Sequence, residues 1–120
     1  GPVTANLLYE TVTGVGVIAA SGSAMTTGPR TAGGKLNDYM TPLECRFVGE
    51  VSHAASGIEP EQMNEICKAI LPKYEDSIKT PDIGKPFQEA YDIDLMEPIP
   101  EWEDIYLRVK EETDELGISC

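Results

Sequence analysis

The chain has 120 residues, 41% hydrophobic and 25% charged, a composition that suits one compact domain-sized core. No apolar run approaches the roughly 20 residues that a membrane-spanning helix needs, which argues against a membrane protein. Residues 1–43 are neutral overall, so residues 44–120 carry the whole net charge of −12 and would repel nucleic-acid phosphates.

Residues 1–40 are rich in glycine, threonine, alanine and serine and form a first region. We expect a short helix over residues 6–10, ended by Gly14 and Gly16, because glycine is a poor helix former.

The remainder of this region is apolar and then rich in glycine. The run at residues 15–20 fits a buried strand or a closely packed helix, and its periodicity does not decide between them. Residues 24–27 are expected to form another short buried strand, followed by a loop over residues 28–34.

The second region, residues 41–120, is predicted to be helical. Its first helix begins with a capping box, in which the side chains of Thr41 and Glu44 satisfy free backbone groups and Pro42 takes the first helical position. Gly57 supplies the stop. Helical spacing marks the face to be buried: Leu43, Phe47, Val48, Val51, Ala54 and Ala55.

The next helix is expected to begin at Pro60 and to be disturbed at Pro72, because proline cannot bond back to the preceding turn. Its buried face is predicted from spacings of three and four residues: Met63, Ile66, Cys67, Ile70, Leu71 and Tyr74.

Beyond it we expect a loop over residues 79–86, a short helix over 86–91 and an extended segment over 92–98. A last helix begins at Pro100 and ends in a Schellman motif at residues 117–118. The side chains expected to dock it are Trp102, Ile105, Tyr106, Val109 and Leu116.

Few residues of this sequence are suited to catalysis or to metal binding. His53 is the only histidine, so a histidine-based triad or a multi-histidine metal site is excluded within the chain, and we assign no catalytic or metal-binding residue. The cysteines are odd in number and widely spaced, which favours reduced thiols in a cytoplasmic protein: Cys45, Cys67 and Cys120. The carboxylates that cluster near Glu101 fit the start of a helix, where negative charge is favourable. Those near Glu111 lie close to a helix end, where acids are mildly unfavourable, and solubility is the reason we assign to them.

The glycine-rich loop is the one segment that fits an anion or a partner protein. Thr27, Gly28 and Arg30 are the candidate contacts, through backbone amides and the guanidinium group. The loop lacks the lysine and hydroxyl residue of a phosphate-binding loop and the spacing of a dinucleotide site.

The order of these motifs resembles the carboxy-terminal portion of the monomethylamine methyltransferase family, the pyrrolysine-containing enzymes of methanogens that use methylamine. The resemblance covers nearly the whole chain and is weakest over residues 14–40. It is carried by Gly1-Pro2-Val3-Thr4, Leu7-Leu8, Thr41-Pro42-Leu43-Glu44-Cys45-Arg46, Gly49-Glu50-Val51, Gly57-Ile58-Glu59, Asn64, Tyr74-Glu75, Gly84-Lys85-Pro86-Phe87-Gln88-Glu89-Ala90-Tyr91-Asp92, Pro98, Tyr106 and Leu116-Gly117.

This resemblance implies a mostly α fragment with one or two short strands. It would comprise the last β/α unit of a TIM (β/α)8 barrel, the end of the barrel at residues 1–40, and a carboxy-terminal helical region at residues 41–120. The family's pyrrolysine and neighbouring acids lie upstream of the match, so we expect the fragment alone to be inactive.

The implied reaction moves the methyl group of monomethylamine to the cobalt of a corrinoid (cobalamin) carried by a partner protein, in methanogenesis. The implied enzyme is a cytoplasmic homo-oligomer. Departures from the family at His53, Pro72 and Pro100 leave another methylated amine open as the substrate. A non-enzymatic acidic helical interaction module is the other alternative.

Overall fold

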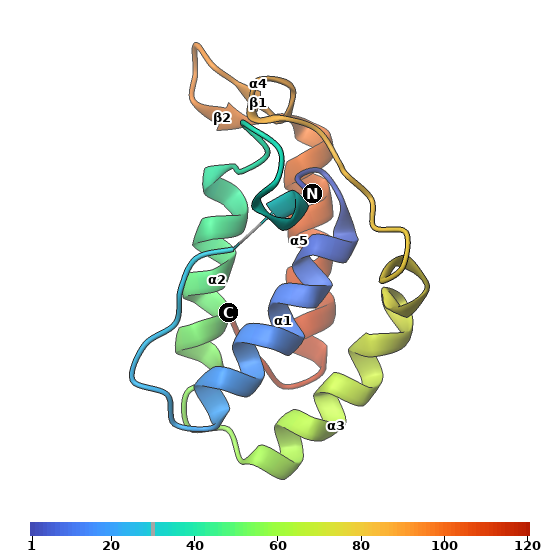
Figure 1. The fold of residues 1–120 in the computed structure, drawn as a ribbon. Helices are drawn as coiled ribbons and strands as arrows, with labels where there is room; N and C mark the ends of the chain where they lie inside the picture. Colours follow the sequence, from blue (N-terminus) through green and yellow to red (C-terminus); the bar gives the residue numbers. More distant parts are fainter. Residues whose placement is uncertain (30) are drawn as a thin grey trace.

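The computed structural model describes residues 1–29 and 31–120 and is mostly helical (Figure 1). The long helices are α1 (Ala5–Ala20), α2 (Pro42–Ala55), α3 (Pro60–Ile70) and α5 (Pro100–Glu115). The shorter elements are the helix α4 (Phe87–Ala90), the strands β1 (Tyr91–Asp92) and β2 (Glu97–Pro98), and the 3-10 turns η1 (Thr31–Gly34), η2 (Leu71–Lys73) and η3 (Glu75–Ser77). The expectation of a mostly α fold with one or two short strands is confirmed.

One core lies between the four long helices, with α1 in contact with α2, α3 and α5. The largest side chains that solvent does not reach are Trp102 and Phe47, and the ring of Phe47 meets that of Tyr106 edge to face at 5.8 Å. The two strands form a small antiparallel hairpin in which Tyr91 pairs with Pro98, at one end of the molecule (Figure 1). Part of the expected extended segment is therefore the turn of this hairpin.

The prediction that glycine ends the first helix is wrong, because α1 continues through Gly14 and Gly16 to Ala20. Leu8 and Val12 on its inner face are fully buried, and burial of two such side chains contributes about 3–6 kcal/mol. Two helical glycines cost about 2 kcal/mol together. Tertiary packing thus outweighs local propensity, and the run at residues 15–20 is helical.

The short strand expected over residues 24–27 is also wrong. This segment has no regular structure, and Met25 is 79% exposed. A strand needs a paired neighbour, and the only ladder among the described residues joins β1 to β2.

The later helices follow the local signals. The capping box at Thr41 and Glu44 is present at the start of α2, and α3 begins at Pro60. Near Pro72 the α-helix gives way to the 3-10 turns η2 and η3. At the end of α5, Gly117 (φ 111°) and Ile118 donate to the carbonyls of Asp114 and Thr113, which is the predicted Schellman motif.

Candidate functional site

The segment that contains the candidate anion contacts forms one wall of a hollow of about 670 Å³ beside α1. Thr27 and Gly28 line it, while Arg30 lies outside the described residues. Thr26 is tied to α2 by a 2.9 Å hydrogen bond between its hydroxyl and that of Ser52. The described residues that line it are mostly apolar and include one acidic side chain: Leu7, Glu10, Thr11, Gly14, Val15, Ile18, Thr26, Thr27, Gly28, Pro29 and Val48.

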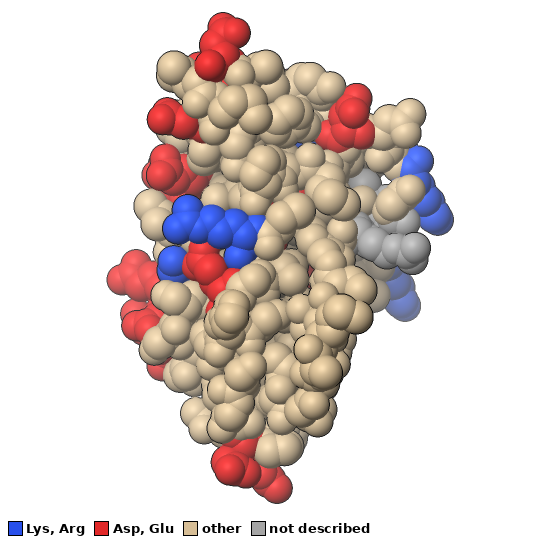
Figure 2. Space-filling model, turned by 90° about the vertical axis from the view of Figure 1, so that its left-hand side faces the viewer, with Lys and Arg blue, Asp and Glu red and all other residues tan. Residues whose placement is uncertain are grey.

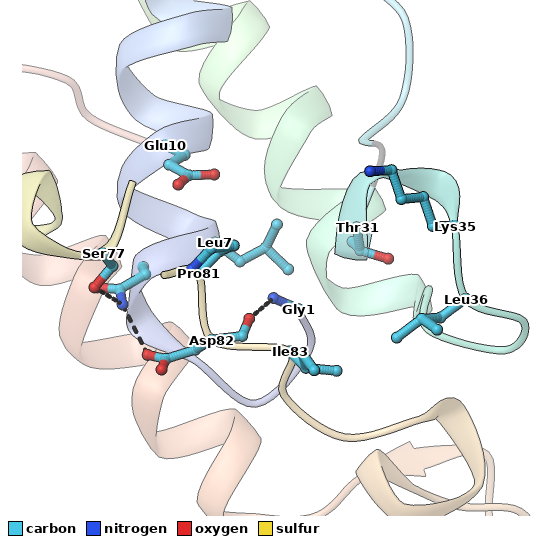
Figure 3. A pocket seen from close by; sticks show the side chains of 11 residues that line it. Gly1, Leu7, Glu10, Thr31, Lys35, Leu36, Ser77, Pro81, Asp82 and Ile83 are labelled. Atoms are coloured by element: carbon cyan, nitrogen blue, oxygen red, sulfur yellow. Dashed lines mark hydrogen bonds between the residues drawn. The ribbon is translucent and has the colours of Figure 1, made fainter. Parts of the chain in front are cut away.

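A second hollow of about 410 Å³ lies at the beginning of α1, between η1 and the segment that follows η3 (Figure 3). The Asn6 amide donates to Ser77 Oγ and to Asp82 Oδ2, each at 2.9 Å, and fastens that segment to α1. The Gly1 ammonium group donates to the Asp82 carbonyl at 2.8 Å. Burial lowers the pKa of this ammonium group, with the charge of Glu10 acting in the opposite direction.

Thr31, on the opposite wall of this hollow, is 3% exposed. Its hydroxyl has no hydrogen-bond partner among the described residues. The two hollows share Leu7 and Glu10, so they adjoin each other along α1. We call this pair of hollows, with the residues lining both, the α1 trough.

Sequence reasoning missed the α1 trough, because its walls come from segments that are far apart in the chain. One signal could have indicated it. In α1 the only charged residue is Glu10, and apolar residues lie on nearly every side of the helix. A helix that is apolar all round is typically covered on all sides.

A buried polar network joins α5 to the start of α2. Trp102 Nε1 donates to Thr41 Oγ1 at 3.1 Å, and the hydroxyl and amide of Thr41 both donate to the Glu44 carboxylate. All three residues are at most 1% exposed. Burial raises the pKa of Glu44, and the hydrogen bonds from Thr41 oppose this rise. The network completes a helix cap and stabilises the fold.

A second polar cluster surrounds Glu50 on α2. Its carboxylate lies 2.7 Å from Lys110 Nζ and 2.8 Å from Arg46 Nε, and it accepts a 2.5 Å hydrogen bond from the Tyr106 hydroxyl. Burial raises the pKa of Glu50, but the hydrogen bonds from Lys110 and Tyr106 outweigh it and leave the pKa below its ordinary value. His53 lies beside this cluster and is exposed.

The three cysteines are free thiols, and burial raises the pKa of each, to about 11 for Cys120. Such thiols are poor nucleophiles at neutral pH. Among the described residues no three histidine, cysteine or acidic side chains come together in a group fit to hold a metal ion. Across the same residues, no helix is both long and apolar enough to cross a membrane.

Comparison with known proteins gives the family. A family model described as monomethylamine methyltransferase MtmB matches residues 1–118. The chain is 33% identical to MtmB of Methanosarcina mazei and 31% identical to MtmB1 of Methanosarcina acetivorans, each over 98% of this chain and 26% of the relative. It also matches the crystal structure of Methanosarcina barkeri MtmB with a TM-score of 0.91 and 31% identity, over 98% of this chain and 26% of that one.

These similarities place the chain in the class of methyltransferases. More particularly, it belongs to the monomethylamine methyltransferase MtmB family, and the match is to a carboxy-terminal portion of that family, as the sequence predicts. The chain spans about a quarter of the length of the curated relatives it matches.

Proposed function

We propose that this chain is the carboxy-terminal part of a methyltransferase that moves the methyl group of monomethylamine to the cobalt of a corrinoid protein. The observation that carries the proposal is the family match over residues 1–118, together with the structural similarity at a TM-score of 0.91. In the proposed enzyme, residues 1–40 adjoin the end of a TIM barrel and residues 41–120 form a helical region beside it.

The chemistry is assigned to the part of the enzyme that this chain does not contain. The buried carboxylate of Glu44 is engaged in a helix cap, and the carboxylate of Glu50 is engaged by Lys110, Arg46 and Tyr106. In the proposal the cobalt belongs to the partner protein. The enzyme is a cytoplasmic homo-oligomer, and Thr27, Gly28 and Arg30 contact an anion or the corrinoid protein.

Two experiments test this proposal. The purified chain is mixed with methylamine and a cobalt(I) corrinoid protein, and the absorbance of methyl-cobalt is followed. We expect no increase over the protein-free rate; an increase would show that the chain holds a complete site.

In the second experiment, the matched quarter of Methanosarcina mazei MtmB is replaced by this chain, and the chimaera is assayed with monomethylamine, dimethylamine and trimethylamine. We expect methyl transfer from monomethylamine. A folded but inactive chimaera contradicts the proposal and favours a non-enzymatic interaction module, whereas preference for another amine corrects the substrate.

A further inference from the structure

We propose that the hollow between α2 and the segment after α5 binds a small molecule through an oxyanion group, a carboxylate or a phosphate, with Arg46 as its main contact. The hollow has a volume of about 540 Å³. Arg46, Gly49 and His53 line it from α2, and Ser119 and Cys120 line it from the other side. Among the described residues, it shares no lining residue with the α1 trough. The inference goes beyond the proposed function and does not depend on it.

Arg46 is held in place on one side and open on the other. Its Nε lies 2.8 Å from Glu50 Oε1, one turn further along α2, and its Cζ lies 6.0 Å from the centre of the Tyr106 ring. The side chain is nevertheless 68% exposed. A guanidinium group has five N–H donors in one plane and matches two oxygens of a carboxylate or a phosphate. The contact through Nε therefore orients the guanidinium group and leaves donors for a ligand.

Glu50 positions the basic side chains, and its own charge is compensated. Its carboxylate lies 2.7 Å from Lys110 Nζ and accepts a hydrogen bond from the Tyr106 hydroxyl, and its side chain is only 18% exposed. Lys110 Nζ lies 5.4 Å from the centre of the Tyr106 ring, so Arg46 and Lys110 converge on the same carboxylate and the same ring. Two positive charges surround one negative charge, and the cluster carries an excess of one positive charge.

This excess stands out in the part of the chain where it lies, because residues 44–120 hold nineteen acidic and seven basic residues. In the other ion pairs of the described residues, Lys68, Lys73 and Lys85 each face a different acid. Figure 2 shows, left of centre, basic side chains that lie against an acidic one, beside a broad area without charge. The surroundings of Glu50 are therefore the place on this acidic protein where a small anion is favoured.

The shape of the hollow suits a compact ligand. Arg46, Gly49 and His53 lie at spacings of three and four residues, on one face of α2. A Cβ atom added at Gly49 would have nothing within 4 Å, so the space above the helix backbone is open. His53 is exposed, and an imidazole ring donates an N–H in either protonation state. Burial raises the pKa of the Cys120 thiol to about 11, so the opposite wall carries no thiolate at neutral pH.

Size and charge together define the class of ligand. Sites for small molecules have volumes of about 300–1,000 Å³, and this hollow falls in that range. The net charge of −12 disfavours polyanions such as nucleic acids, which would meet the acidic surface around the hollow. A small carboxylate or phosphate ester meets only Arg46 and its neighbours.

The test is an NMR titration of the isotope-labelled chain with inorganic phosphate and, separately, with citrate, at constant ionic strength. We expect saturable shifts of the amides near Gly49 and Ser119, with a dissociation constant of roughly 1–10 mM. Arg46→Gln should weaken binding about tenfold or more, because charge-assisted hydrogen bonds are lost. Arg108→Gln is the matched control, since it removes the same charge from an exposed position on α5 outside the hollow, and it should change the affinity by less than about twofold.

Two further variants separate geometry from charge and from folding. Arg46→Lys keeps the charge but loses the planar group of donors, so it should weaken binding less than Arg46→Gln does. Gly49→Leu fills the open space above α2 and should abolish binding, while its thermal midpoint should not fall, because leucine favours helix. In the chimaera with Methanosarcina mazei MtmB, the anion that binds more tightly should raise the thermal midpoint, and Arg46→Gln should remove that rise.

The proposal is overturned if neither anion gives saturable shifts, if Arg108→Gln weakens binding as much as Arg46→Gln, or if Gly49→Leu binds normally. An anion that leaves the midpoint of the chimaera unchanged would also overturn it, because the hollow would then be closed in the longer protein. Tighter binding of phosphate assigns the ligand to phosphate esters, and tighter binding of citrate assigns it to carboxylates. Methyl transfer is not measured in this test, so its failure leaves the proposed function untouched.

Discussion

Replacing Trp102 with alanine should destabilise the chain more than any other single change on α5. Trp102 is fully buried, and its indole N–H donates to Thr41 Oγ1 at 3.1 Å. The same threonine donates to the Glu44 carboxylate at the start of α2. Trp102→Ala therefore opens a cavity in the core and removes the donor that joins α5 to the cap of α2.

The magnitude follows from burial. A buried tryptophan removes on the order of 150–250 Å² from water, which is worth about 4–6 kcal/mol at about 25 cal/mol per Å². Measured substitutions of this kind cost about 3–5 kcal/mol. At about 4 °C for each kcal/mol in a chain of this length, the thermal midpoint should fall by roughly 12–20 °C. Since the free energy of unfolding of a domain is only about 5–15 kcal/mol, this substitution should remove a large part of the chain's stability.

Far-UV circular dichroism is the suitable assay, because Trp102 is the only tryptophan and the variant has lost its fluorescence. Trp102→Phe keeps most of the ring but not the N–H group and should cost about 1–2 kcal/mol. Glu103→Gln changes an exposed neighbour and should leave the urea midpoint unchanged. The reasoning fails if Trp102→Ala matches the unaltered chain, or if Glu103→Gln is the more damaging change.

Three further outcomes are expected. Because Glu44 has a raised pKa, the folded chain loses stability as pH rises from the ordinary value of 4.5 to the raised pKa, and Glu44→Gln should abolish this loss in urea melts across that range. Because Glu50 has a lowered pKa, Glu50→Gln should destabilise at neutral pH, and its effect should fade as pH falls below 4.5 through the lowered pKa. Gly117→Ala should cost about 1–2 kcal/mol at its φ of 111°, whereas Gly49→Ala, inside α2, should stabilise by about 0.5–1 kcal/mol; equal effects would contradict this.

The elements that the sequence predicts well are those defined by local chemistry. Three such signals are the capping box at Thr41, the proline at position 60 and the Schellman glycine at position 117. Each acts on residues next to it in the sequence, so it can be recognised without knowledge of the fold. The course of α1 is different, because Gly14 and Gly16 favour a break locally and only burial against other helices overrides them. The strand expected over residues 24–27 fails for the related reason that strands need partners.

The candidate site was harder to predict than the fold. Thr27 and Gly28 do line a hollow, but its other walls come from α1 and α2, and no local motif joins these segments. Only the composition of α1 indicated that a hollow lies beside it, since this helix holds one charged residue and has apolar side chains on nearly every side. Such a pattern indicates that a helix is covered and leaves open what covers it.

The two sides of α1 also bear on the order of assembly. The inner side buries Leu8, Val12 and Gly16 within this chain, so the helix can form before anything docks on it. The outer side then leaves Val17, Ile18 and the α1 trough in water. An exposed apolar patch of this kind favours association, so an undocked chain would tend to self-associate. The net charge of −12 opposes this self-association, because it repels a second copy but does not hinder docking of a partner that is not itself acidic.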